Sequence, residues 1–106
     1  MRSGRGEEVR TRYVIAYDVA KPARLRKTYK LMCAHGDPLQ YSVFQCDLSA
    51  SERIVLIERL VEILNLKEDR ILIVDVGPAE GRGQANIEVI GKRLSWEPVD
   101  RSARIV

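Results

Sequence analysis

The residue best placed to do chemistry in this chain is Asp18, which comes near the end of a run of β-branched and aromatic residues from Arg12 to Val19. Such a run predicts a β-strand. Strand alternation puts Asp18 on the same face as Val14 and Ala16, so its carboxylate follows two small apolar neighbours. A charge buried there is costly unless it is paired or bound to a metal ion. The plainer alternative is a solvated strand end, or a cap for the turn before the next helix.

Basic residues follow Asp18 on the next predicted element. Apolar residues at helical spacing predict a helix that begins near Pro22 and ends at Gly36. Four basic residues lie off its apolar stripe: Arg24, Arg26, Lys27 and Lys30. No acidic residue occurs between Asp18 and Asp37, whereas a helix that only needs solubility commonly mixes both signs. These side chains are candidates for binding phosphate, and the alternative is an ordinary solvated face.

Charge and composition narrow the classes of protein that fit. The 106 residues suit one domain, and an apolar share of 45% suits a folded core. Residues 1–36 hold nine Lys and Arg against three Asp and Glu, which favours a polyanionic partner. No apolar run approaches the roughly 18 residues that span a bilayer, and the start has no apolar signal region. We therefore expect a cytoplasmic protein without a membrane partner.

The cysteines and the single histidine exclude several kinds of site. Cys33 and Cys46 are too few and too isolated for a disulfide framework or a zinc site, so we expect small buried residues. A Ser-His-Asp triad could use only His35. That residue lies beside the predicted helix end, where a cation is a structural device.

The remaining elements complete a small α+β domain. Gln40 to Leu48 predicts a second strand, and Ser49 to Glu52 is a capping box that starts a second helix. Arg70 to Val76 predicts a third strand, whose nearly continuous apolar run indicates a central position. After a glycine-containing loop, Ile87 to Ile90 predicts a short fourth strand.

The element order β-α-β-α-β-β predicts a ferredoxin-like sandwich, with two helices on one face of an antiparallel sheet. We expect this domain to span residues 12–91, after a mobile N-terminal tail over residues 1–11. The other sheet face is too apolar to stay wet, so a homodimer through that face is expected. Residues 92–106 end in Ile105-Val106 and predict a C-terminal segment that pairs at a sheet edge or at the dimer interface.

Taken together, the motifs resemble the CRISPR-associated protein family called "Cas two". They are Tyr17-Asp18-Val19, Arg24-Leu25-Arg26-Lys27, Gly36 and Gln40-Tyr41-Ser42-Val43-Phe44, in this order and spacing. The resemblance covers about residues 12–76. It implies a ferredoxin-like homodimer that acts in the acquisition of new spacers, where it bridges two CRISPR integrase dimers and supports the captured DNA duplex. For some members it also implies a magnesium-dependent nuclease acting on single-stranded RNA or double-stranded DNA.

The same resemblance implies site residues. The family aspartate falls on Asp18, its early-helix basic position on Arg24 or Arg26, and its strand Ser and Phe on Ser42 and Phe44. One carboxylate is a poor magnesium site, so two copies of Asp18 across a dimer axis, with water, would hold Mg²⁺ or Mn²⁺ better. Ser42 would then orient the reacting groups and Arg24 or Arg26 would clamp phosphate. Phe44 either stacks on a base or belongs to the core.

Two functions of different classes stay open. In the first, which we favour as the physiological role, the chain is a scaffold that binds duplex DNA through Arg24, Arg26, Lys27 and Lys30 and holds the CRISPR integrase. In the second, it is a metal-dependent endonuclease. Many family members carry Glu where this chain has Gln45, so one acidic group is missing here. The alternative to both is a ferredoxin-like regulatory or nucleic-acid-binding module without catalysis.

Overall fold

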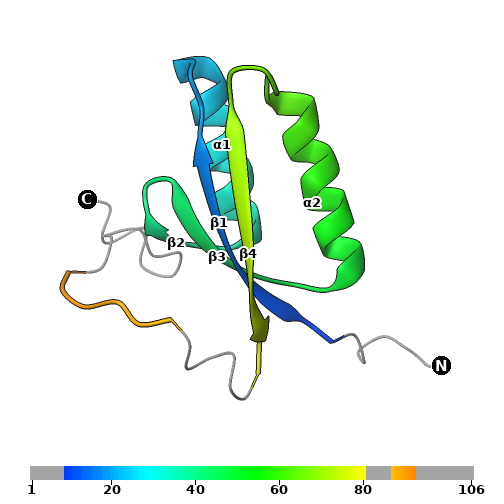
Figure 1. The fold of residues 1–106 in the computed structure, drawn as a ribbon, viewed down its shortest axis with the longest axis vertical. Helices are drawn as coiled ribbons and strands as arrows, with labels where there is room; N and C mark the ends of the chain where they lie inside the picture. Colours follow the sequence, from blue (N-terminus) through cyan, green and yellow to red (C-terminus); the bar gives the residue numbers. More distant parts are fainter. Residues whose placement is uncertain (1–8, 81–86, 93–106) are drawn as a thin grey trace.

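The chain forms a four-stranded antiparallel sheet and two helices in the computed structural model, which describes residues 9–80 and 87–92 (Figure 1). In chain order the elements are β1 (Thr11–Asp18), α1 (Pro22–His35), β2 (Asp37–Gln40), β3 (Val43–Leu48), α2 (Ala50–Ile63) and β4 (Arg70–Pro78). The strand order across the sheet is β2-β3-β1-β4, and every neighbouring pair is antiparallel. The central position predicted for residues 70–76 is wrong, because β4 lies at the edge of the sheet. The predicted ferredoxin-like α+β fold is confirmed.

The order of the elements along the chain differs from the predicted one. It is β-α-β-β-α-β, because the predicted second strand is part of a hairpin in which Tyr41 and Ser42 form the turn between β2 and β3. Asp37 and Pro38 begin β2 at the edge of the sheet, where proline is tolerated. Residues 87–90, predicted as a strand, have no regular secondary structure, and Ile90 is 92% exposed instead of packing on the sheet.

The core lies between the helices and one face of the sheet. Side chains alternate along β3, where Phe44, Cys46 and Leu48 are buried and the residues between them are partly exposed. Each helix adds an apolar stripe to this layer. The buried cluster consists of Ile15, Tyr17, Met32, Phe44, Cys46, Leu48, Leu56, Leu60 and Leu64. Cys46 is thus a small buried residue, as predicted.

Local contacts set where each helix begins or ends. The predicted capping box is present at α2: the Ser49 amide donates to the Glu52 carboxylate at 2.9 Å, and the Glu52 amide donates to the Ser49 hydroxyl at 3.2 Å. The end of α1 lies close against β3, where a Cβ on Gly36 would be 2.4 Å from the Gln45 carbonyl oxygen and 2.5 Å from the Cys46 sulfur. Position 36 therefore requires glycine, because even a Cβ atom there would clash with β3.

The opposite face of the sheet, which we call the open face, carries apolar side chains in neighbouring register. Ala16 pairs with Val43 on one side and with Leu72 on the other. Leu72 is 58% exposed and Val74 is 45% exposed. The predicted homodimer would cover these residues, and it stays a prediction because the structure holds one chain.

Parts of the predicted domain organisation lie outside the described residues. These are residues 1–8 of the expected N-terminal tail and residues 93–106 of the expected C-terminal segment. β1 begins at Thr11, one residue before the expected boundary of the domain. Within the described ranges, neither helix has the length and apolar character needed to cross a membrane.

Candidate functional site

A pocket of about 750 Å³ opens at the end of β1, and we call it the β1-end pocket. Its walls come from β1, α1 and the turn between β2 and β3. It is lined by Tyr17, Asp18, Val19, Leu25, Arg26, Tyr29, Lys30, Tyr41 and Ser42. The structure therefore brings together four residues that the sequence predicted: Asp18, Arg26, Lys30 and Ser42.

The Asp18 carboxylate is exposed and makes no hydrogen bond or ion pair with any described residue. In the sheet, Asp18 lies opposite Arg70 of β4, and both residues border a smaller hollow of about 230 Å³ beside Ala16 and Leu72. Asp18 thus borders both the β1-end pocket and the open face. Among the described residues, no group of three His, Cys, Asp or Glu side chains is placed to hold a metal ion, so one copy of the chain offers a single carboxylate here.

Arg24 does not line the β1-end pocket. Its guanidinium donates to the Asp69 carboxylate at 2.8 and 3.1 Å, and to Glu68 at 2.9 Å. The Asp69 side chain has no exposed surface. The hydrogen bond from Arg24 holds the pKa of Asp69 well below its usual range, and the same bond raises the pKa of Arg24. Arg26 is the early-helix arginine whose side chain reaches the pocket.

Asp69 also fixes two backbone segments. Its carboxylate accepts the amide of Ala20 at 2.8 Å and the amide of Asn65 at 2.9 Å. Ala20 lies in the turn between β1 and α1, and Asn65 follows the end of α2. The Arg24–Asp69 pair therefore joins the turn after Asp18 to the loop before β4.

Tyr17 holds the hairpin turn against the end of β1. Its amide donates to the Ser42 carbonyl oxygen at 3.0 Å, and its hydroxyl donates to the Tyr41 carbonyl oxygen at 3.0 Å. Burial raises the pKa of the Tyr17 hydroxyl, so this donor stays protonated at neutral pH. These two bonds set the positions of Tyr41 and Ser42 relative to Asp18, the residue that follows Tyr17.

Phe44 lies beneath the pocket. Its ring stacks on that of Tyr17 with centroids 6.2 Å apart, and meets Tyr29 edge to face at 5.6 Å. Phe44 is 0% exposed, so its ring offers no surface on which a base could stack. It supports two tyrosines that line the pocket. Lys27 is exposed on α1 and does not line the pocket.

Sequence reasoning missed two residues near Asp18. Tyr41 belongs to the motif over residues 40–44, but its exposure depends on the turn between β2 and β3, which a continuous strand over residues 40–48 would lack. The sequence indicates Arg70 only as the first residue of a strand. Its place at the start of a strand is the signal that could have identified it as a neighbour of Asp18. An antiparallel β4 beside β1 places the start of one strand opposite the end of the other.

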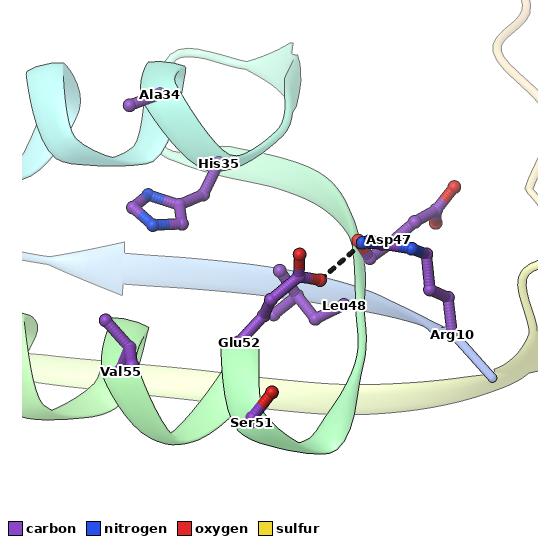
Figure 2. Close-up of a pocket in the computed structure, with 8 residues that line it drawn as sticks. All are labelled: Arg10, Ala34, His35, Asp47, Leu48, Ser51, Glu52 and Val55. Carbon is purple, nitrogen blue, oxygen red and sulfur yellow. Dashed lines mark hydrogen bonds and ion pairs between the residues drawn. The ribbon is translucent and has the colours of Figure 1, made fainter. Parts of the chain in front are cut away.

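A second pocket of about 350 Å³ lies at the opposite end of β1 (Figure 2). It is lined by Arg10, Ala34, His35, Asp47, Leu48, Ser51, Glu52 and Val55. Figure 2 shows Arg10 reaching across to Glu52, its ion-pair partner. Asp47 accepts two hydrogen bonds of 2.8 Å from Arg12. The Nδ1 atom of His35 lies 3.0 Å from a carbonyl oxygen of its own helix, so the ring is engaged at the helix end.

Known proteins resemble this chain along most of its length. Residues 11–81 match the family model described as CRISPR associated protein Cas2. The chain is 39% identical over 94 residues to the CRISPR-associated endoribonuclease Cas2 1 of Rhodospirillum rubrum, with 89% of each chain covered. It is also 39% identical to the CRISPR-associated endoribonuclease Cas2 of Geobacter sulfurreducens, in an alignment that covers 89% of this chain and 96% of the relative. The Streptococcus pyogenes Cas2 structure matches with a TM-score of 0.65 and 32% identity, covering 76% of this chain and 99% of that one.

Proposed function

Because the chain belongs to the CRISPR-associated Cas2 family, we propose that it is a metal-dependent endonuclease that also binds duplex DNA during the acquisition of new spacers. The relatives at 39% identity are named endoribonucleases, which supports RNA as the cleaved substrate. The proposal is carried by one juxtaposition. The Asp18 carboxylate, which is unpaired within the described chain, shares a pocket with Arg26 and Lys30. A carboxylate for a cation and basic groups for phosphate are what phosphodiester hydrolysis requires.

Asp18 is the residue that would hold the metal ion. Its exposed carboxylate has no competing partner among the described residues, and carboxylate oxygens suit Mg²⁺ and Mn²⁺. One such group per chain fits a site shared by two copies, with water as the remaining ligand. When bound, the ion supplies positive charge at the phosphate and a bound water of lowered pKa.

The chain's own residues bind and orient the substrate. Arg26 and Lys30 lie one helical turn apart on α1, so both can contact phosphate from one side of the pocket. Ser42 offers a hydroxyl from a turn that Tyr17 holds in place. Arg26 takes the clamping role here, because Arg24 is engaged by Asp69.

The spacer-acquisition role uses other parts of the surface. Arg26, Lys27 and Lys30 form an exposed basic strip on α1 that would contact duplex phosphates without reading base sequence. The open face would join two copies, and the resulting homodimer would bridge two dimers of the CRISPR integrase. A homodimer also brings a second copy of the chain to the open face that Asp18 borders.

Asp18→Asn separates the two parts of this function. Asn keeps the shape of the side chain and removes the charge that attracts a cation, so magnesium-dependent cleavage of single-stranded RNA should be lost. The melting temperature should stay unchanged, because Asp18 has no side-chain partner in the described structure. Duplex DNA binding should change little, and spacer integration with the integrase should survive.

The matched control is Asp75→Asn, which alters another exposed carboxylate in the same sheet that does not line the β1-end pocket. This control should cleave RNA as well as the unaltered protein does. Cleavage retained by Asp18→Asn would remove the metal site from the proposal. Integration lost in a folded, dimeric Asp18→Asn protein would show that scaffolding depends on this carboxylate.

A further inference from the structure

We propose that the β1-end pocket receives an unpaired base of a single-stranded nucleic acid. In this arrangement the ring of Tyr41 stacks on the base, and the phosphate of the same nucleotide contacts Arg26 and Lys30. The inference rests on the proposed nuclease function, because it places the substrate beside Asp18. It adds a base-binding residue, Tyr41, to the residues that the sequence pattern singled out.

The lining of the pocket suits a flat aromatic ring with a charged group at one side. Three tyrosines line it, accompanied by Val19 and Leu25, so most of its inner surface is apolar. A volume of about 750 Å³ lies within the roughly 300–1,000 Å³ range of pockets that bind small ligands. A few polar groups at the wall of an apolar pocket are the usual means of orienting a ligand.

Tyr41 is the lining aromatic residue that is free to meet a ligand. Its side chain is 77% exposed, whereas Tyr17 is 6% exposed and packs against Phe44. The backbone of Tyr41 is nevertheless held in place, because its carbonyl oxygen accepts the hydrogen bond from the Tyr17 hydroxyl. An exposed ring on an anchored turn provides a stacking surface with little ordering cost.

The charges in the pocket indicate where the phosphate binds. Arg26 and Lys30 outnumber the single carboxylate, Asp18, and neither makes an ion pair with a described residue. A phosphate is attracted to these two cations on α1 and repelled by Asp18 on β1. The base of a Watson–Crick pair is stacked on both sides within its helix, so an unpaired nucleotide is the form that can offer its face to Tyr41.

The test measures binding of the full chain to a fluorescein-labelled oligouridylate of ten nucleotides by fluorescence anisotropy, with EDTA present so that nothing is cleaved. Tyr41→Ala should weaken binding roughly tenfold, because stacking of one base contributes about that much. Tyr41→Phe keeps the ring and should bind as the unaltered protein does. Because position 41 is exposed, both variants should keep the unaltered melting temperature.

Two control ligands identify the base as the group that Tyr41 contacts. On a ribose-phosphate oligomer of the same length without bases, Tyr41→Ala and the unaltered protein should bind equally well. On a blunt duplex, the substitution should change affinity by less than about twofold, because the bases are paired. Equal loss of affinity for all three ligands would overturn the proposal, as would oligouridylate binding that Tyr41→Ala leaves intact.

These outcomes are independent of the metal site. All binding is measured without a divalent cation, so a Tyr41 effect can be present even if Asp18→Asn retains cleavage. Conversely, loss of cleavage in Asp18→Asn together with unaltered binding by Tyr41→Ala would preserve the proposed nuclease and exclude the base pocket. Arg59→Ala serves as the control, since Arg59 is exposed on α2, lies outside the basic strip and does not line the pocket, so this variant should bind oligouridylate as the unaltered protein does.

Discussion

Charged residues lie at both ends of β1, but those at its start have ion-pair partners and the one at its end has none among the described residues. At the start of the strand, Arg10 pairs with Glu52 (Figure 2). Arg12 binds Asp47 through two hydrogen bonds. At the other end, Asp18 has no side-chain partner among the described residues. Charges at the start of the strand are engaged with each other, whereas charges left unpaired in a pocket are available to a ligand. Charge content alone does not distinguish the two ends.

The same contrast between paired and unpaired charges occurs within α1, between two arginines that lie two positions apart in the sequence. Arg24 and Arg26 both belong to the basic motif of α1, yet Arg24 is bound by the buried carboxylate of Asp69 and Arg26 lines the β1-end pocket. A motif that contains two arginines can therefore hold one structural and one ligand-binding residue. Three experiments test this contrast between paired and unpaired charges.

The largest expected effect is that of Asp69→Ala on stability. It leaves Arg24 with only its more exposed partner, Glu68, and removes the acceptor of the Ala20 and Asn65 amides. Loss of one member of a buried, hydrogen-bonded pair is strongly destabilising, so we expect the melting temperature to fall by about 10 °C or more. Thermal unfolding followed by circular dichroism measures it.

Glu68→Ala is the control for this substitution, because Glu68 is about half exposed and accepts a single bond from Arg24. It should shift the melting temperature only slightly. Equal effects of the two substitutions would mean that the burial of Asp69 contributes little, and that Arg24 is held no more firmly than an exposed ion pair.

Local patterns predicted much of this molecule. The capping box of α2, the glycine at the end of α1 and the strand over residues 43–48 each depend on residues close in sequence, and the structure contains all three. The pairing of Arg24 was not predictable, because Asp69 lies 45 residues away. The hairpin turn was missed because Tyr41 and Val43 have strong β propensity on both sides of Ser42, and no glycine marks the turn.

The second-largest expected effect is on the oligomeric state, which decides whether Asp18 can acquire a partner from another copy of the chain. Leu72 lies on the open face and borders the same hollow as Asp18 and Arg70. Leu72→Glu would bury a carboxylate in the proposed dimer interface, so it should convert the dimer to a monomer at micromolar concentration. Sedimentation velocity measures this change.

Ile54→Glu provides the control. Ile54 is 57% exposed on α2, nearly the same as Leu72, so the substitution adds the same charge at a similarly exposed apolar position away from the open face. This variant should remain a dimer. A monomeric unaltered protein, or a dimeric Leu72→Glu protein, would contradict the open face as the interface, and Asp18 would then act within one copy.

The smallest expected effect is on the salt dependence of duplex DNA binding. The affinity for duplex DNA falls as salt rises, and replacing both Arg26 and Lys30 by Ala should make this dependence shallower. The slope of log affinity against log salt should become less negative by about 1.8, because each phosphate that is no longer neutralised removes about 0.9 from its magnitude. Arg24→Gln should leave the slope unchanged while lowering the melting temperature, since Arg24 is committed to Asp69. An equal change of slope in both proteins would abolish the distinction between the two arginines.

The hydrogen bond between the Ala20 amide and Asp69 also has a consequence for how the site forms during folding. It connects residues 49 positions apart, from the first β-α unit to the loop after the second helix. Contacts of such sequence separation form only after a long loop has closed. A growing chain that has reached α2 but not residue 69 thus lacks the carboxylate that holds the turn after Asp18. We therefore expect the end of β1 to reach its final geometry only after the loop before β4 has docked on the first β-α unit.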